Sequence, residues 1–204
     1  MEHVCLDLEG VLIPEIWAEV AEYTGEEQFK LTTQDLKDYS ELMDMRVNLV
    51  ESIGLSFSEI QSLVEKMEPF DGAREFIDWV RDNFQLTIVS DSFYELAWPL
   101  LRKLGTPAIN CHYLDIENNQ LKGYTLRQLE NKKKVVQSLK DMKFKVFASG
   151  DSYNDIQMLQ EADLGVFFQA PKHIREEFKE IDGVESHADL KNLLIENSSF
   201  IGRT

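Results

Sequence analysis

Acidic and hydroxyl side chains stand at the ends of three apolar segments of this 204-residue chain. The first segment lies within VCLDLEGVL at 4–12, the second ends in SDS at 90–92, and the third leads into GDSYND at 150–155. The side chains concerned are those of Asp7, Glu9, Ser90, Asp91, Asp151 and Asp155. Any one of them could be a helix N-cap or a solvated strand end. Their recurrence at three segment ends indicates a shared polar site.

Four of these side chains carry carboxylates that would repel one another in a common crevice. Asp7, Glu9, Asp151 and Asp155 would have to be protonated there or neutralised by a cation. Oxygen ligands suit Mg²⁺, which typically combines one or two carboxylates with water and with phosphate oxygens of a substrate. The pattern therefore predicts a Mg²⁺ site for phosphoryl-transfer chemistry.

The apolar segments have the length and composition of buried parallel strands. We expect strands at 3–8, 85–90, 145–150 and 163–168, and amphipathic helices at 71–83, 93–104, 132–142, 153–162 and 187–196. Strands and helices in alternation favour an α/β fold with a mostly parallel, Rossmann-like sheet. Ligands of such sheets bind beyond the carboxyl ends of the strands, which is where the polar side chains stand.

Residues 14–70 interrupt this alternation. They contain no convincing strand. Three stretches are helix-like, at 15–24, 40–53 and 56–66. We predict a helical cap domain at 14–70, inserted into a catalytic core formed by 1–13 and 71–204. A small hairpin is expected at 113–125, around the turn residues Asn118 and Asn119.

Composition limits the classes of partner. With 21 Lys and Arg against 37 Asp and Glu, the formal charge is −16, which disfavours nucleic acid and anionic lipid. A local site that holds a divalent cation can still bind a phosphorylated metabolite. The two cysteines, Cys5 and Cys111, have no metal-binding spacing and are expected to be reduced packing residues. We expect a cytoplasmic protein without a membrane span, and leave a homodimer open.

Four ordered motifs resemble those of the haloacid dehalogenase-like phosphatases. They are DLEGV at 7–11, Ser90 after an apolar segment, a lysine of NKKK at 131–134, and GDSYND at 150–155. The insert after the first motif resembles the C1 cap of that superfamily. More narrowly, DLEGVLIPEIW, SDSFYE and GYTLRQ are similar to its bifunctional phosphoserine phosphatase/homoserine phosphotransferase branch. The resemblance implies a Mg²⁺-dependent phosphatase of O-phospho-L-serine, with L-homoserine as a further phosphoryl acceptor.

The resemblance also implies roles in catalysis. Asp7 would be the nucleophile that becomes an aspartyl phosphate, and Glu9 the general acid and then the general base. Ser90 and Lys132 would hold the phosphoryl oxygens. Lys132 is chosen over its neighbours because it falls where the family lysine opens its helix, although Lys133 and Lys134 stay open as alternatives.

Metal and substrate ligands are implied in the same way. Asp151, the Asp7 side chain and the backbone carbonyl of Glu9 would coordinate Mg²⁺, and Asp155 would orient metal-bound water or Lys132. Glu15 and Arg46 match positions that meet the amino and carboxylate groups of phosphoserine, and Asp91 is grouped with Ser90 among the substrate-binding residues. A helix-terminal charge for Glu15 and a surface position for Arg46 are the ordinary alternatives.

The sequence departs from the family pattern at two positions. Most members carry Asp where this chain has Glu9, and phosphoserine phosphatases usually carry SGG where it has SDS at 90–92. Two other functions therefore stay open: a phosphatase of another small phosphomonoester, and a receiver-type signalling domain. The four histidines form no spaced metal cluster and are expected at the surface or in packing.

Overall fold

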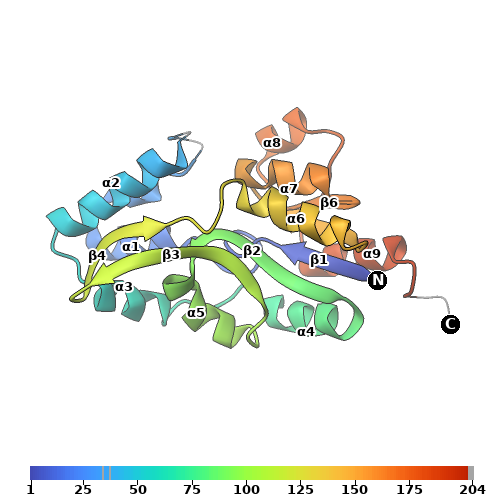
Figure 1. The fold of residues 1–204 in the computed structure, drawn as a ribbon, viewed down its shortest axis with the longest axis horizontal. Coiled ribbons are helices and arrows are strands. Elements are labelled where there is room, and N and C mark those ends of the chain that lie inside the picture. Colours follow the sequence, from blue (N-terminus) through green and yellow to red (C-terminus); the bar gives the residue numbers. More distant parts are fainter. Residues whose placement is uncertain (34, 37, 202–204) are drawn as a thin grey trace.

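A seven-stranded sheet forms the centre of the molecule (Figure 1). The structure is a computed structural model that describes residues 1–33, 35, 36 and 38–201. Its strand order is β4-β3-β2-β1-β5-β6-β7, with every neighbouring pair parallel except β3 and β4. The strands are β1 (Glu2–Leu6), β2 (Gln85–Phe93), β3 (Ile109–Glu117), β4 (Gln120–Thr125), β5 (Lys145–Gly150), β6 (Leu164–Phe168) and β7 (Asp182–Val184). The predicted α/β class with a mostly parallel sheet is confirmed.

Helices cover both faces of the sheet. In Figure 1, α4 (Ala73–Asn83) and α5 (Tyr94–Lys103) lie on one face, and α6 (Asn131–Asp141) and α7 (Ile156–Glu161) on the other. The short α8 (Lys172–Glu177) lies near α7, and α9 (His187–Asn197) packs against α4. The helix expected at 153–162 is divided into a 3₁₀ turn, η2 (Tyr153–Asp155), and α7.

The insert between β1 and α4 contains helices and no strand among its described residues, as predicted. It contains α1 (Ile16–Thr24), the 3₁₀ turn η1 (Glu27–Lys30), α2 (Tyr39–Ser52) and α3 (Phe57–Val64). Local capping explains two helix starts: the Asp38 side chain accepts from the backbone N–H of Ser40 at 2.8 Å, and Ser56 forms a capping box with Glu59. The treatment of 14–70 as a separate cap domain stays a prediction.

The predicted hairpin joins the insert to the sheet. Asn118 and Asn119 form the turn between β3 and β4 with φ angles of 49° and 62°, which asparagine tolerates better than most residues. Asn119 then accepts from two backbone N–H groups at the start of α3, those of Phe57 and Ser58, both at 2.9 Å. The hairpin therefore holds the insert beside the carboxyl ends of the central strands.

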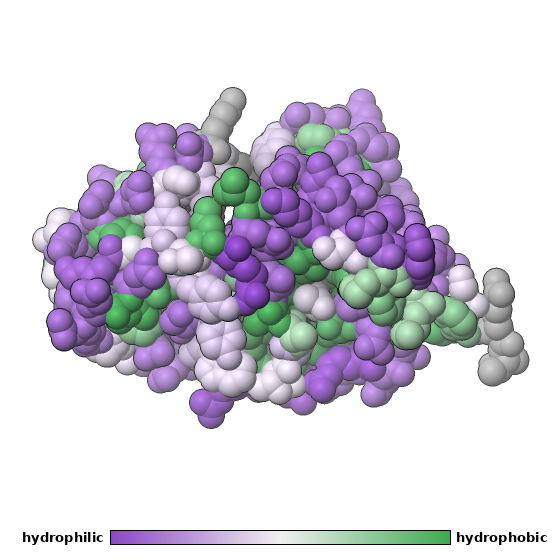
Figure 2. Space-filling view, in the orientation of Figure 1, coloured by the Kyte–Doolittle hydropathy of each residue, from purple (hydrophilic) through white to green (hydrophobic). Residues whose placement is uncertain are grey.

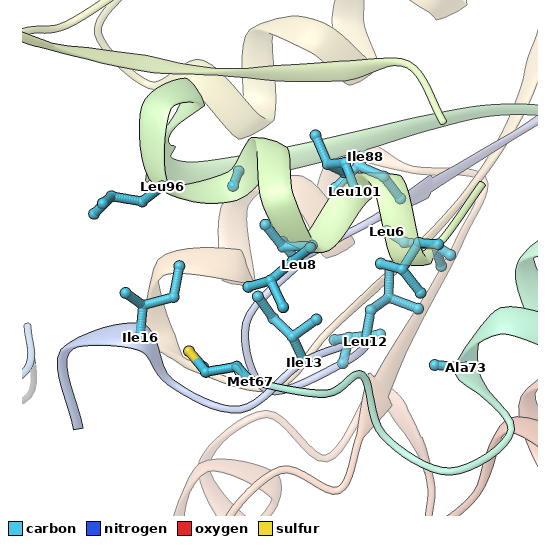
Figure 3. Packing of buried hydrophobic residues seen from close by; sticks show 14 of the residues in the cluster. Leu6, Leu8, Leu12, Ile13, Ile16, Met67, Ala73, Ile88, Leu96 and Leu101 are labelled. Atoms are coloured by element: carbon cyan, nitrogen blue, oxygen red, sulfur yellow. The ribbon is translucent and has the colours of Figure 1, made fainter. Parts of the chain in front are cut away.

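Strand β1 and the turn after it lie in the hydrophobic core. Leu6, Leu8, Leu12 and Ile13 are fully buried, and Figure 3 shows them packed with residues of β2 and α5. Burial of the side chains on both sides of Asp7 fixes the backbone at this position. The sequence around Asp7 is thus mostly core, which explains its apolar character.

Three features of the sheet were not predicted. Strand β2 continues to Phe93, with an irregular register between Val89 and Phe93, and the parallel pairing of β3 begins at Ile109. Strand β7 has three residues and was too short to recognise from its composition. Among the described residues, no helix has the length and apolar character required to cross a membrane.

Candidate active site

Asp7 lies immediately after β1 and is nearly enclosed. Its backbone N–H donates to the Ser149 carbonyl of β5 at 2.9 Å, and its Oδ1 accepts from the Leu8 N–H at 2.7 Å. Its Oδ2 accepts from Lys132 Nζ at 2.8 Å, and its side chain is only 6% exposed. The carboxylate of Asp7 is thus held by two donors at the carboxyl end of the central strand.

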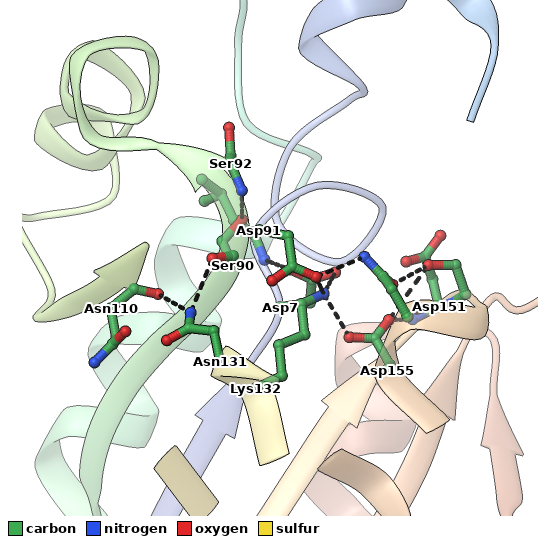
Figure 4. Close-up of polar contacts among 12 residues, drawn as sticks. Asp7, Ser90, Asp91, Ser92, Asn110, Asn131, Lys132, Asp151 and Asp155 are labelled. Carbon is green, nitrogen blue, oxygen red and sulfur yellow. Dashed lines mark hydrogen bonds and ion pairs between the residues drawn. The ribbon is translucent and has the colours of Figure 1, made fainter. Parts of the chain in front are cut away.

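Lys132 connects the first and last motifs. It lies in the first turn of α6, and its Nζ donates to Asp7 Oδ2 at 2.8 Å and to Asp155 Oδ1 at 2.7 Å (Figure 4). Lys133 and Lys134 are half-buried, and the structure gives neither a contact with Asp7. The geometry therefore favours Lys132 over its two neighbours, while its catalytic role stays a prediction.

Asp151 joins the two carboxylates that Lys132 contacts in one acidic cluster. One oxygen from each of Asp7, Asp151 and Asp155 lies within 4.8 Å of the others. Burial and the neighbouring Asp155 raise the pKa of Asp7 well above its usual value, against the effect of Lys132. Burial and Asp155 likewise raise the pKa of Asp151 to about 7. The described residues thus concentrate negative charge here beyond what Lys132 offsets.

A hard divalent cation fits this donor set. Carboxylate oxygens in a partly open cluster are suitable for Mg²⁺, and a cation would relieve the repulsion that raises both pKa values. Asp7 and Asp151 would hold it, with Asp155 beside them. The Glu9 carboxylate is not a member of this cluster, so a metal contact from Glu9 would have to use its carbonyl oxygen.

Two glycines allow these acidic groups to approach the backbone. A Cβ at Gly10 would lie 2.3 Å from Asp151 Oδ2, and a Cβ at Gly150 would lie 2.2 Å from Asp155 Cγ. Gly10 also has a φ of +75°. The glycines of DLEG and GDSYND are therefore required by the site, a role that the sequence analysis did not identify.

Ser90 and Asp91 lie in the irregular segment of β2. The register with β3 shifts between Val89 and Phe93, which is the effect of a β-bulge and turns side chains out of the regular alternation. Ser90 is buried, and its Oγ accepts from the Ser92 N–H at 3.1 Å. Asp91 lies 4.0 Å from Lys132 Nζ. Asp91 thus lies beside the ammonium, and Ser90 lines the same cavity as Asp7 and Lys132.

Asn131 was not identified from the sequence. It is buried beside Lys132, and its Nδ2 donates to the backbone carbonyls of Ser90 at 3.3 Å and Asn110 at 3.4 Å. Figure 4 shows it between β2 and β3. It joins the start of α6 to the bulge, and its position directly before Lys132 was the one available signal.

The insert contributes an enclosing wall. Asp7, Glu9, Glu15, Arg46 and Lys132 line a cavity of about 140 Å³. Glu9 Oε2 accepts from the Ile16 N–H, the first of α1, at 2.9 Å. Burial, together with Glu9, raises the pKa of Glu15 to about 8. The structure therefore brings both predicted substrate ligands of the insert to the same cavity as the predicted nucleophile.

Arg46 is buried on the wall formed by the insert. Its Nη2 donates to the Leu31 carbonyl at 2.8 Å, and its guanidinium lies 5.0 Å from the centre of the Trp17 ring. Its Nε has no hydrogen-bond partner among the described residues. Because Arg46 also lines the cavity, its guanidinium is suited to bind an anionic group of a ligand. The alternative of a surface position for Arg46 is wrong.

A larger groove of about 970 Å³ adjoins this cavity. Residues common to both are Thr33, Tyr39, Asp91, Lys132 and Asn154. The groove runs between the start of α2 and the η2–α8 region, and the face drawn in Figure 2 is hollowed between these two parts of the molecule. A ligand can therefore reach Lys132 from outside along this groove.

Comparisons with known proteins give a family match and two similar relatives. The model of the haloacid dehalogenase-like hydrolases matches residues 1–163. The chain is 44% identical to phosphoserine phosphatase ThrH of Pseudomonas aeruginosa over 200 residues, 98% of each chain. It is 43% identical to a phosphoserine phosphatase of Pseudomonas syringae pv. tomato, over 98% of this chain and 84% of the relative.

Solved structures share the fold. A substrate-bound phosphoserine phosphatase complex superposes with a TM-score of 0.79 at 22% identity, over 95% of this chain and 96% of the other. A phospho-aspartyl intermediate analogue of a phosphoserine phosphatase gives a TM-score of 0.78 at 23% identity, over 95% and 97%. The family model matches residues 1–163, and the arrangement of Asp7, Lys132 and Asp151 is consistent with it. This chain therefore belongs to the haloacid dehalogenase-like hydrolase family.

Proposed function

We propose that this chain is a Mg²⁺-dependent phosphoserine phosphatase that acts through an aspartyl phosphate at Asp7 and also transfers the phosphoryl group to homoserine. One observation carries the proposal: Asp7 and Lys132 share a cavity of about 140 Å³ with an acid and a base of the insert, Glu15 and Arg46. A phosphorylated amino acid needs a phosphoryl site and partners for its carboxylate and its ammonium, and a bound ammonium would lower the raised pKa of Glu15. The names of the two relatives above support the same substrate.

The first half-reaction forms the intermediate. An Asp7 oxygen attacks phosphorus, the bond between phosphorus and the serine oxygen breaks, and Glu9 gives its proton to that oxygen. Lys132 and the Ser90 hydroxyl donate to the phosphoryl oxygens, where negative charge is concentrated. When bound, Mg²⁺ would offset the charge of the carboxylates and polarise the phosphoryl group.

The second half-reaction regenerates the enzyme. Glu9, now a carboxylate, takes a proton from water or from the homoserine hydroxyl, and the oxygen of that acceptor attacks phosphorus. The bond between phosphorus and Asp7 breaks, which restores the Asp7 carboxylate. The Glu9 side chain lines the same cavity and is held at the start of α1, so a proton donor and acceptor is available for both steps.

The direct assay uses phosphoserine and Mg²⁺, with and without homoserine. Free phosphate and O-phosphohomoserine are followed together, because their ratio separates hydrolysis from transfer. Release of phosphate without O-phosphohomoserine would remove the transferase part of the proposal. Turnover of an aryl phosphate without turnover of phosphoserine would instead favour the phosphatase of another small phosphomonoester. The family match leaves the receiver-type signalling domain without support.

Arg46 gives a sharper test of the substrate. We expect Arg46→Ala to raise KM for phosphoserine roughly 10- to 100-fold, because a buried charged hydrogen bond to the substrate carboxylate is lost. The KM for an aryl phosphate, which lacks that carboxylate, should change little. Arg46→Lys is the matched control, since it retains the charge but not the paired donors. Equal effects of Arg46→Ala on both substrates would contradict the assignment.

A further inference from the structure

One of the N–H donors of Lys132 has no hydrogen-bond partner among the described residues. A lysine ammonium carries three N–H donors. Two are used by Asp7 and Asp155, at 2.8 and 2.7 Å. Asp91 Oδ2 lies 4.0 Å from Nζ, too far for a hydrogen bond. The third N–H can thus donate to a phosphoryl oxygen, provided that the Asp91 carboxylate does not accept from it instead.

Several contacts hold Asp91 in its place. Asn154 Nδ2 donates to Asp91 Oδ2 at 3.2 Å, and the Asn154 Oδ1 accepts from the Ser152 hydroxyl at 2.6 Å, which fixes the orientation of the amide. From the insert, the Tyr39 hydroxyl donates to the Asp91 backbone carbonyl at 2.5 Å. These contacts restrain the backbone and one of the two carboxylate oxygens.

His112 faces the other carboxylate oxygen. It lies on β3 opposite Phe93, just past the bulge of β2, and its Nε2 is 3.6 Å from Asp91 Oδ1. Its Nδ1 accepts from the backbone N–H of Arg127 at 3.1 Å, so the ring proton lies on Nε2 and points to Asp91. The His112 side chain is only 4% exposed. A buried ring fixed in this tautomer keeps the positive end of an N–H dipole toward the Asp91 carboxylate, at a distance just beyond a hydrogen bond.

We propose that His112 is a positioning residue of this site. By attracting Oδ1 it restrains rotation of the Asp91 carboxylate, so that Oδ2 stays 4.0 Å from Lys132 Nζ and one Lys132 donor stays free for the phosphoryl group. Without it, the carboxylate would turn toward the nearby ammonium and occupy that donor. The inference rests on the proposed phosphoryl transfer at Asp7 but not on the identity of the substrate.

Two substitutions separate the contacts of His112. His112→Asn retains an acceptor near the Nδ1 position for the Arg127 N–H and removes the donor toward Asp91. His112→Gln places an amide N–H near the Nε2 position and removes the acceptor for Arg127. The first variant should lower kcat for an aryl phosphate roughly 10- to 100-fold, as for the loss or misplacement of one stabilising donor. The second should retain most of the kcat of the wild type.

The same substitution is then made in an Asp91→Ala background, which lacks the carboxylate that would capture Lys132. There His112→Asn should change kcat by no more than about twofold. If His112→Asn only reduced the amount of folded protein, kcat would fall in both backgrounds. Comparison of the two backgrounds therefore separates a positioning role from a loss of stability. An aryl phosphate is used because its turnover tests the inference even if phosphoserine is not the substrate. Equal losses in H112N and H112Q, no loss in H112N, or a loss that persists with Asp91→Ala would overturn the inference.

Discussion

The two ends of strand β1 both bury polar side chains, and they do so in opposite ways. At the amino end, the Glu2 carboxylate accepts from the Ser198 hydroxyl and from the Ser199 N–H, both at 2.7 Å. At the carboxyl end, the carboxylate of Asp7 shares the Lys132 ammonium with a second carboxylate, and a third lies close by. At the amino end, neutral donors satisfy the single charge of Glu2. At the carboxyl end, several carboxylates lie close together around Asp7.

This difference separates structural polar groups from functional ones. A buried carboxylate with its own hydrogen-bond donors is compatible with the fold and needs no further ligand. Carboxylates that raise one another's pKa, as Asp155 does for Asp7 and Asp151, act against folding. The carboxyl end is therefore explained by chemistry, and the amino end by packing.

The largest effect is expected from Asp7→Asn. The substitution preserves size but removes the proposed nucleophile, so kcat for phosphoserine should fall by at least about a thousandfold. The free energy of unfolding should stay the same or rise, because one of the crowded charges is lost. Steady-state kinetics and urea denaturation measure the two effects. A large loss of stability would mean that the carboxyl end is structural after all.

Lys132→Met should show how strongly the stability of the acidic cluster at the carboxyl end of β1 depends on the Lys132 ammonium. Removal of the ammonium leaves Asp7 and Asp155 buried together, so we expect a loss of about 3–5 kcal/mol in the free energy of unfolding. Mg²⁺ should recover part of this loss. The combination with Asp7→Asn is the control, because it removes one of the stranded charges and should restore stability. A Lys132→Met variant as stable as the wild type would contradict the charge argument.

The amino end should respond to pH through His3. Burial lowers the pKa of His3 from 6.5 to about 4. Because the folded-state pKa is the lower one, the stabilisation is present above pH 6.5 and is lost as the pH falls toward 4. The loss at pH 5 should reach about 2 kcal/mol. Urea denaturation at pH 7.5 and 5 measures it, with His3→Gln as the matched variant that should lack this contribution.

Glu2→Gln should have the smallest effect of the four. It retains the size and one acceptor oxygen but weakens two hydrogen bonds to a charged group, at a cost of about 1 kcal/mol in stability. Turnover of phosphoserine should be unchanged, since Glu2 lies at the opposite end of β1 from Asp7. A clear fall in kcat would show that the two ends of the strand are not independent.

The sequence predicted the crowded end well because its residues follow the strand period and the order of motifs. Asp7, Ser90 and Asp151 stand directly after apolar runs, and parallel pairing brings such positions together at one edge of a sheet. The four predicted parallel strands agree with β1, β2, β5 and β6 within three residues at each end, whereas β7 was not predicted. The order of the four motifs along the chain was sufficient to indicate the family.

Other parts of the site depend on long-range pairing that no local pattern reveals. His112 lies near Asp91 beside the irregular segment of β2 between Val89 and Phe93, and this register shift is a property of two strands together. Gly10 and Gly150 are explained only once the carboxylates near them are known. The histidine prediction was incomplete for the same reason, since His112 is buried as a packing residue would be but also contacts the site.

The central claim is that the crowded carboxylates serve phosphoryl transfer through Asp7, and trapping of the covalent enzyme tests it most directly. The protein is mixed with phosphoserine and Mg²⁺, quenched in acid within one turnover, digested and analysed by mass spectrometry. We predict one added phosphoryl group on the peptide that contains Asp7, and none in the Asp7→Asn variant. Rapid turnover without any phosphorylated peptide, or with the group on another residue, would contradict the account.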